Sequence, residues 1–278
     1  MKNMKKIICL ALAMLMCAMC FVGCGKTEAE NTTAATDGTT ASTEETTTAA
    51  EETTAAPEVK TLTMATNASF PPYEYYEGEK IVGIDAEVAA AIAEKLGMEL
   101  VIEDMKFDAI IPSVVSGGAD IGMAGMTVTD ERKESVDFSV SYATGIQSVI
   151  VKTGGTVKSL DDLAGKKIGV QLSTTGDIYA SDDYGEDNVI KYNTGNEAVI
   201  ALLGGDVDAV IIDNQPALAY VSLNEGLEIL GTEYAVEEYA IAVNKGNTEL
   251  LDKINGALEE LIADGTVDAI VAKYISAN

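Results

Sequence analysis

The sequence predicts an α/β fold built as two lobes. Strand-like apolar runs alternate with helix-like runs from residue 62 onward, which is typical of parallel βαβ units. A helix, two glycines and an apolar strand occupy residues 107–124, and a similar block recurs at 197–212 with spacing that differs by one residue. Segments 149–152 and 239–243 are expected to cross between the lobes, so that the lobes hinge around a ligand.

Hydrophobic spacing and glycine stops predict the elements of the first lobe. Asp85 is expected to cap a helix and Gly97 to end it. Residues 67–76 contain Pro71-Pro72 and several aromatic residues, and are expected to form a loop. The predicted elements are strands at 62–65, 100–103 and 119–124, helices at 86–96 and 107–116, and a short helix that holds Arg132.

The second lobe and the C-terminal part follow the same patterns. A strand that ends near Gln171 leads through a turn of small residues into a helix, and the chain ends in two helices divided at Asp264-Gly265. The predicted elements are helices at 177–179, 197–203, 248–263 and 266–275, and a strand at 207–212. The residues at helical spacing that are expected to face the core are Leu250, Leu251, Ile254, Leu258, Leu261 and Ile262.

The N-terminus has the pattern of a processing signal. Basic Lys2, Lys5 and Lys6 precede an apolar run over residues 7–22, which is short for a membrane span and typical of a signal peptide. The run closes on Phe-Val-Gly before Cys24, which resembles the lipobox of bacterial lipoproteins, although Phe is less usual than Leu at its first position. The resemblance implies that Cys24 becomes the lipidated N-terminus; the alternative is an ordinary secretory signal with a chance cysteine.

Composition narrows the function further. Residues 25–56 lack aromatic and branched aliphatic side chains and are expected to form a disordered tether. All 4 cysteines lie at or before Cys24 and the chain has 0 His, which excludes disulfides in the mature domain, His-dependent triads and His-based zinc sites. A formal net charge of -27 argues against nucleic acid as a partner.

Three groups of polar residues follow predicted strand ends, where open α/β sheets bind ligands. The first contains Arg132, whose guanidinium fork matches a carboxylate; the alternative is an arginine on a solvated helix. The second is the turn at 173–176, whose free N–H groups suit an anion; the alternative is a simple helix cap. The third is Asp213, an acid after an apolar strand that is suited to an ammonium group; the alternative is a loop cap.

Taken together, these motifs resemble the polar amino acid-binding proteins of bacterial ABC importers, the family 3 extracellular solute-binding proteins. The resemblance extends from residue 62 to the C-terminus. The motifs that carry it are, in order, 66–74 (TNASFPPYE), 82–85 (VGID), 107–112 (FDAIIP), 124–133 (AGMTVTDERK), 136–139 (VDFS), and 169–171 with 174–176 (GVQ and TTG). It implies the two-lobe, type II periplasmic binding protein-like fold with two crossing hinge strands.

The resemblance also implies a role for each matching residue. Arg132 would pair with the ligand α-carboxylate, helped by the amides of Thr127 and Thr175. The carbonyl of Gly125, the hydroxyl of Thr127 and the carboxylate of Asp213 would hold the α-ammonium. The residues left for the ligand side chain are Phe70 and Phe107, which would sandwich it, and Asn67 and Gln171, which would tune specificity.

The expected ligand is a free polar L-amino acid. Gln171 offers both a donor and an acceptor, which favours a glutamine-like side chain. Relatives that take basic amino acids often carry an acid where this chain has Asn67. Glu74 and Asp85 are the acids that could take its place, so a basic ligand stays an open alternative. No cofactor, no metal and no catalytic residue is expected. The alternatives are a dehydratase-type enzyme on the same fold, with Arg132 holding a substrate carboxylate, and a ligand-sensing domain.

The expected organisation places the protein at the extracellular face of the cell membrane. It would be a monomer held only by a lipid anchor such as palmitate, and it would deliver its ligand to a separate permease. The expected segments are a signal peptide at 1–23, the lipidated cysteine and tether at 24–57, one lobe at 58–150 plus 241–278, and a second lobe at 151–240.

Overall fold

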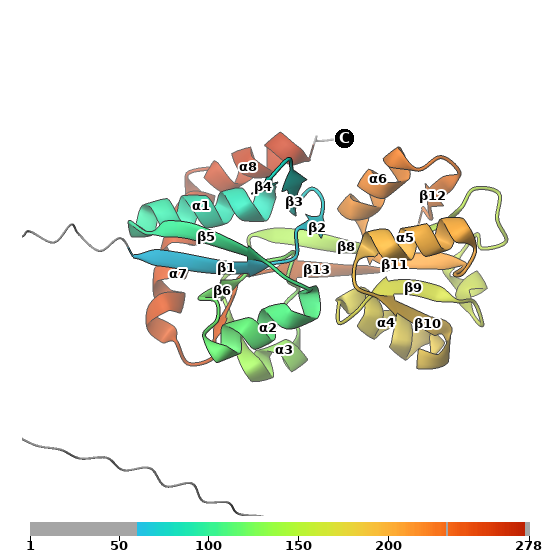
Figure 1. Ribbon diagram of the computed structural model, residues 1–278, viewed down its shortest axis with the longest axis horizontal. Helices are drawn as coiled ribbons and strands as arrows, with labels where there is room; N and C mark the ends of the chain where they lie inside the picture. The colour runs from blue at the N-terminus through green and yellow to red at the C-terminus, as the bar shows by residue number, and fades with distance from the viewer. Residues whose placement is uncertain (1–59, 232, 276–278) are drawn as a thin grey trace, which may run out of the picture. The chain divides into compact units, whose positions relative to one another are not determined.

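The computed structural model describes residues 60–231 and 233–275, and these residues form two main sheets flanked by helices, with a small third sheet (Figure 1). The signal peptide, Cys24 and the tether expected at 1–57 lie outside the described residues. The first sheet has the strand order β5-β1-β6-β14-β7. Its strands are β1 (Thr61–Thr66), β5 (Glu99–Asp104), β6 (Ile121–Gly122), β7 (Val136–Phe138) and β14 (Ala242–Asn244).

Parallel strands form the centre of the first sheet, as the alternating sequence pattern predicts. β1 pairs in parallel with β5 and β6, whereas β14 returns antiparallel to β6 and β7. In Figure 1, α1 and α2 cover opposite faces of this sheet. The helices of this part are α1 (Ile84–Leu96), α2 (Phe107–Ser116), α3 (Asp130–Ser135), α7 (Thr248–Ala263) and α8 (Thr266–Tyr274), and a small hairpin sheet holds β2 (Ser69–Phe70), β3 (Glu74–Glu77) and β4 (Lys80–Val82).

The second sheet has the order β10-β9-β11-β8-β12, with β13 also paired to β8. Its strands are β8 (Ala143–Lys152), β9 (Ile168–Gln171), β10 (Val189–Tyr192), β11 (Ala209–Asp213), β12 (Leu227–Ile229) and β13 (Ala235–Tyr239). The accompanying helices are α4 (Thr175–Tyr184), α5 (Gly195–Gly204) and α6 (Asn214–Leu223), with short 3₁₀ turns at Leu160–Leu163 and Glu186–Asn188. Buried aliphatic residues such as Val149, Ile168 and Ile211 form part of the core beneath this sheet.

The chain crosses between the two sheets twice, and the two crossings lie side by side. One crossing is the segment 139–142 between β7 and β8, and the other is 240–241 between β13 and β14. The Ser139 N–H donates to the Ile241 carbonyl at 2.9 Å, and the Tyr142 N–H donates to the Tyr239 carbonyl at 3.0 Å. These hydrogen bonds make the crossings a two-stranded connection, which is a suitable place for a hinge.

Several sequence predictions agree with these elements and several are wrong. The predicted helices at 107–116 and 248–263 coincide with α2 and α7. The predicted crossing at 149–152 is wrong, because that segment lies within the second sheet and pairs with β11 and β12. The loop expected at 67–76 contains the strands β2 and β3, and the strand expected at 119–124 is reduced to Ile121–Gly122.

Two side chains also differ from their predicted roles. Gly83, not Asp85, precedes α1 as its N-cap, and Asp85 is buried and points to partners elsewhere. Ile262 is 40% exposed rather than core-facing, although Ile254, Leu258 and Leu261 on the same helix are buried. The predicted lobe boundaries near residues 150 and 240 stay a prediction about which parts move together.

Candidate ligand-binding site

All nine residues that the sequence singled out for ligand contact line one pocket. They come from loops and helix starts that follow strands of both sheets, where α/β folds commonly bind ligands. The lining residues are Asn67, Phe70, Glu74, Phe107, Ala124, Gly125, Thr127, Arg132, Gln171, Thr174, Thr175 and Asp213. The cavity volume is about 20 Å³, which is room for one or two water molecules.

Arg132 lies in the short helix α3 and reaches toward both sheets. The side chain of Thr129 accepts a hydrogen bond from the Arg132 N–H and so caps the helix. The Arg132 guanidinium donates to the Thr127 carbonyl at 2.7 Å and to the Ser173 carbonyl at 3.0 Å. It also lies 5.3 Å from the centre of the Phe107 ring, within cation–π range. The alternative of a solvated arginine is excluded, because Arg132 is only 8% exposed.

Burial lowers the pKa of Arg132 from its usual value, and the carboxylates of Glu237 and Asp213 oppose this change. An arginine side chain nevertheless stays protonated in proteins. Its guanidinium therefore brings a permanent positive charge to one end of the pocket, where it suits an anionic group.

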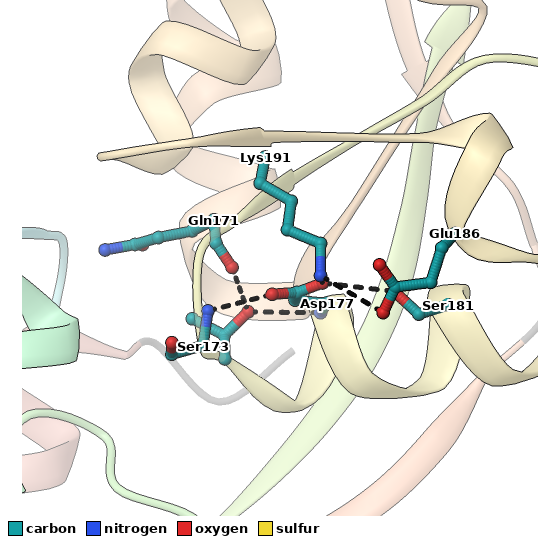
Figure 2. Close-up of polar contacts among 7 residues, drawn as sticks. Gln171, Ser173, Asp177, Ser181, Glu186 and Lys191 are labelled. Atoms are coloured by element: carbon teal, nitrogen blue, oxygen red, sulfur yellow. Dashed lines mark hydrogen bonds and ion pairs between the residues drawn. The ribbon is translucent and has the colours of Figure 1, made fainter. Parts of the chain in front are cut away.

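The turn between β9 and α4 is fixed by a network around Asp177 (Figure 2). One carboxylate oxygen of Asp177 accepts from the Ser173 N–H at 2.9 Å, and the other lies 3.0 Å from the Lys191 ammonium. Thr174 caps α4 by accepting from the Asp177 N–H at 3.3 Å, so the predicted helix cap is present. Ser173 adopts φ 63°, the left-handed region, and this conformation presents its carbonyl to Arg132.

The same turn leads into Thr175, the first residue of α4, whose role toward an anion stays a prediction. The first N–H groups of a helix have no partner within the helix, and they carry its positive partial charge. The cap by Thr174 and the lining by Thr175 are therefore compatible, since they use different groups of the same turn.

Asp213 lies at the end of β11 and belongs to a buried polar cluster. Its carboxylate accepts from the Gln147 side-chain amide at 2.8 Å and from the Tyr239 hydroxyl. The same Gln147 amide donates to Glu237 at 3.0 Å, and the Thr127 hydroxyl donates to Glu237 at 3.2 Å. Asp213 makes no side-chain cap bond to α6, so the loop-cap alternative does not explain its position.

Burial raises the pKa of Asp213 well above its usual range, and the like charge of Glu237 raises it further. Gln147 and Glu237 were not predicted from the sequence. Glu237 and Tyr239 lie on the same inward face of β13, and no local signal in the sequence distinguishes Glu237 from the exposed Glu238 beside it.

Asn67 and Gln171 meet across the pocket from the two sheets. The Gln171 amide donates to the Asn67 side-chain oxygen at 3.0 Å and to the Asn193 carbonyl at 3.1 Å. The Asn67 amide donates in turn to the Met105 carbonyl at 2.8 Å. Phe70 is nearly buried, and its ring packs against Tyr73 with 5.8 Å between ring centres.

Gly125 is held in place by Asp85, a contact that the sequence did not predict. The Gly125 N–H donates to the Asp85 carboxylate at 2.8 Å, and Tyr142 donates to both Asp85 oxygens at 2.9 Å. Burial raises the pKa of Asp85 to about 6, and it raises that of Glu74 well above its usual range, with Asp85 contributing. Of these two acids, Glu74 lines the pocket and Asp85 lies behind Gly125.

Two sheets joined by paired crossings, with a pocket lined from both, define a two-lobe binding protein of the type II periplasmic class. Residues 62–277 match the bacterial extracellular solute-binding proteins, family 3, and the chain belongs to this family. It is therefore a solute-binding protein and not an enzyme.

Relatives of known function cover most of the chain. The chain is 35% identical to the arginine-binding extracellular protein ArtP of Bacillus subtilis (strain 168), with 78% of this chain and 87% of that protein covered. It is 32% identical to the L-cystine-binding protein TcyJ of Escherichia coli (strain K12), with 78% and 84% covered. Among solved structures, an ancestral arginine-binding protein bound to glutamine matches with a TM-score of 0.75 and 46% identity, over 79% of this chain and 100% of that one.

Within residues 60–231 and 233–275, no cluster of three or more acidic, cysteine or histidine side chains is arranged to hold a metal ion. In the same residues, no helix combines the length and the apolar character that a membrane span needs.

Proposed function

We propose that this protein is the amino acid-binding component of a bacterial ABC importer. The observation that carries the proposal is the arrangement of charge in one pocket. The Arg132 guanidinium and the start of α4 suit an anion, while Asp213 suits a cation. An amino acid zwitterion carries both charges on neighbouring atoms, so it satisfies both subsites at once.

In the proposed pose, Arg132 and the amides of Thr127 and Thr175 bind the α-carboxylate. The α-ammonium is held by the Gly125 carbonyl, the Thr127 hydroxyl and the Asp213 carboxylate. The ligand side chain then lies between Phe70 and Phe107 and reaches toward Asn67 and Gln171. All of these residues line the pocket, which supports the pose.

The proposed ligands are polar L-amino acids. The side-chain amides of Asn67 and Gln171 each offer a donor and an acceptor, which favours a glutamine-like side chain. Glu74 lines the same pocket and could pair with a basic ligand side chain, so basic amino acids belong to the proposed range. The relatives are consistent with this range, since one is named for arginine, one for cystine, and one structure holds glutamine.

Ligand entry requires the lobes to separate. A cavity of about 20 Å³ is too small for an amino acid, and contacts such as Arg132 to Ser173 close it from both sides. We place the hinge at the crossings 139–142 and 240–241. A ligand that contacts both lobes favours closure because it binds the closed state more tightly.

A thermal-shift screen of the full mature chain against the common L-amino acids tests the proposal. A ligand that binds only the folded state stabilises it by about 2.7 kcal/mol at one hundred times its Kd. We expect L-glutamine or another polar L-amino acid to raise the apparent Tm, and the D-enantiomer to have little effect. If no L-amino acid raises the Tm, the proposed function is wrong.

The proposal extends to the location and to delivery. We propose that Cys24 is lipidated, for example by palmitate, and that the monomeric protein remains at the extracellular face of the membrane near its permease. Labelling of cells with a palmitate analogue should mark the wild type and not Cys24→Ser. Recovery of Cys24→Ser in the membrane fraction at the wild-type level would contradict the anchor.

A further inference from the structure

Two buried carboxylates share a single amide donor behind the proposed ammonium subsite. The Gln147 side-chain nitrogen lies 2.8 Å from an Asp213 oxygen and 3.0 Å from a Glu237 oxygen. Gln147 is fully buried, Glu237 is 5% exposed and Asp213 is 6% exposed. The two acids come from neighbours of the same central strand, β8, which pairs with β11 on one side and with β13 on the other.

The hydrogen bonds that the two carboxylates accept come from uncharged groups, so these bonds do not offset the negative charges. Asp213 also accepts from the Tyr239 hydroxyl, and Glu237 also accepts from the Thr127 hydroxyl. The other Glu237 oxygen is buried and has no hydrogen-bond partner among the described residues. The Arg132 guanidinium donates hydrogen bonds to the carbonyls of Thr127 and Ser173, and to neither acid.

The charged and titratable groups that face the pair do not supply a second cation. They belong to α3, α4, β3, the β2–β3 connection and β13, and they influence one another through the pocket. These groups are Arg132, Tyr179, Glu74, Tyr73 and Tyr239. Burial raises the pKa of Asp213, with the like charge of Glu237 as the next cause, so without a ligand the site favours a protonated Asp213. Because both carboxylates contact the same Gln147 nitrogen, a proton bound at Asp213 also removes the like-charge repulsion with Glu237.

We propose that Glu237 is a positioning residue of the ammonium subsite, and that its carboxylate and that of Asp213 hold one proton between them until an amino acid binds. The ligand ammonium then takes the place of this proton, which is released to solvent, so the positive charge at the ammonium subsite is conserved. Glu237 acts through Thr127 and Gln147, both of which donate to it. This inference rests on the proposed function, because it requires a ligand that carries an ammonium group.

A second acid is buried here, although one acid would be enough to hold an ammonium group, and the shared proton accounts for it. A lone carboxylate beside Arg132 would already have a charged neighbour, so an added buried acid carries a desolvation cost unless a proton or a cation offsets it. With Glu237 present, the proton offsets the second acid before binding, and the ligand ammonium offsets it after binding. Amino acids are then favoured over carboxylic acids of the same shape that lack an amino group.

Isothermal titration calorimetry of the full mature chain tests the inference directly. L-glutamine and L-arginine are the probes, each titrated in buffers that differ in ionisation enthalpy, between about pH 5 and pH 9. The slope of observed enthalpy against buffer enthalpy gives the number of protons released. We expect net proton release, up to one per ligand, and an affinity that increases with pH over the same range.

Three variants of β13 provide the comparison. Glu237→Gln keeps the shape and removes the charge, and we expect it to lose the proton release, to flatten the pH profile and to weaken binding about tenfold at high pH. Glu238→Gln changes the same charge at the next, exposed position and should match the wild type. Glu237→Asp retains a carboxylate and should retain proton release. Circular dichroism confirms that each variant is folded.

The outcomes separate this inference from the proposed function. Wild-type binding of an amino acid without proton release at any pH would overturn the inference and leave the function intact. Equal proton release by the wild type and Glu237→Gln would also overturn it. If neither L-glutamine nor L-arginine binds the wild type, a third amino acid identified by the thermal-shift screen replaces them; if none binds, the function and the inference both fail.

Discussion

Arg132 donates a hydrogen bond to the carbonyl oxygen of Ser173 at 3.0 Å. This bond links α3, which belongs with the first sheet, to the turn between β9 and α4 in the second. The other terminal nitrogen of Arg132 donates to Thr127 on its own side of the pocket at 2.7 Å. One guanidinium is thus held by carbonyls from both sides of the pocket. Its role in ligand binding and its role in closure are therefore expected to be inseparable.

Arg132→Lys is expected to weaken amino acid binding about 100-fold. Lysine keeps the positive charge, but it lacks the planar fork that matches a carboxylate with two parallel hydrogen bonds. Its ammonium also cannot serve the Thr127 and Ser173 carbonyls in the same geometry. Isothermal titration calorimetry measures the change, with Lys133→Ala on the exposed side of α3 as the matched control. A Kd within threefold of the wild type would exclude a bidentate role for Arg132.

Asp177→Ala is expected to destabilise the protein by about 1–3 kcal/mol and to weaken ligand binding. The Asp177 carboxylate fixes the Ser173 N–H, the Ser181 hydroxyl and the Lys191 ammonium, as Figure 2 shows. Without this carboxylate, the Ser173 N–H loses its hydrogen bond, and the left-handed conformation of Ser173 is stabilised less. That conformation is uncommon for a residue other than glycine.

Urea denaturation and calorimetry measure the two effects of Asp177→Ala. Asp182→Ala is the control, because Asp182 lies on the same helix and is exposed. A loss of stability without a loss of affinity would show that the turn is structural only.

Much of the fold could be predicted because local signals and the final packing agree. The helix α2 begins and ends as predicted, since its apolar residues follow helical spacing and Gly117 ends it with φ 76°. The nine predicted ligand-contact residues follow from motifs at strand ends and from the family resemblance, and the sheets bring those strand ends together.

The buried acids were missed or misjudged because their burial arises from strand pairing far along the chain. Asp85 has the local pattern of a helix cap, yet Gly125 and Tyr142 provide its partners. Glu237 looks like one of two adjacent strand acids, and only the pairing of β13 with β8 places it beside Gln147. A polar side chain inside a short strand carries no local mark of which face it occupies.

Glu74→Gln is expected to change how the stability of the ligand-free protein depends on pH. Glu74 and Asp85 have ordinary pKa values of 4.5 and 3.8, and burial raises that of Asp85 to about 6 and that of Glu74 well above its usual range. The folded state binds their protons more tightly than the unfolded state does. Their contribution is therefore fully present below about pH 4 and is lost as the pH rises through about 6 and above.

Glu74→Gln removes one of these two titrations, so its unfolding free energy should fall less between pH 4 and pH 7 than that of the wild type. Urea denaturation at several pH values measures the difference from the wild type. Glu77→Gln, at an exposed position on the same strand, should run parallel to the wild type. Parallel curves for Glu74→Gln as well would show that Glu74 does not carry a raised pKa.

Gly145→Ala and Gly256→Ala are expected to change stability in opposite directions. Gly145 lies in β8 beside the crossings, and a methyl group there would overlap the Tyr239 ring. The ring cannot move away freely, because its hydroxyl donates to Asp213 and it forms a T-shaped pair with Tyr73, with 5.2 Å between ring centres. We expect a loss of about 1–3 kcal/mol, together with weaker amino acid binding through the displaced Asp213.

Gly256 lies on the exposed face of α7, and nothing lies within 4 Å of a methyl group placed there. Alanine is the better helix former, so Gly256→Ala should stabilise the protein by about 0.5–1 kcal/mol and leave binding unchanged. Thermal and urea unfolding measure both variants, and calorimetry measures their affinities. Wild-type affinity in a folded Gly145→Ala would mean that Tyr239 does not position Asp213, since the same methyl group must displace the ring that holds it.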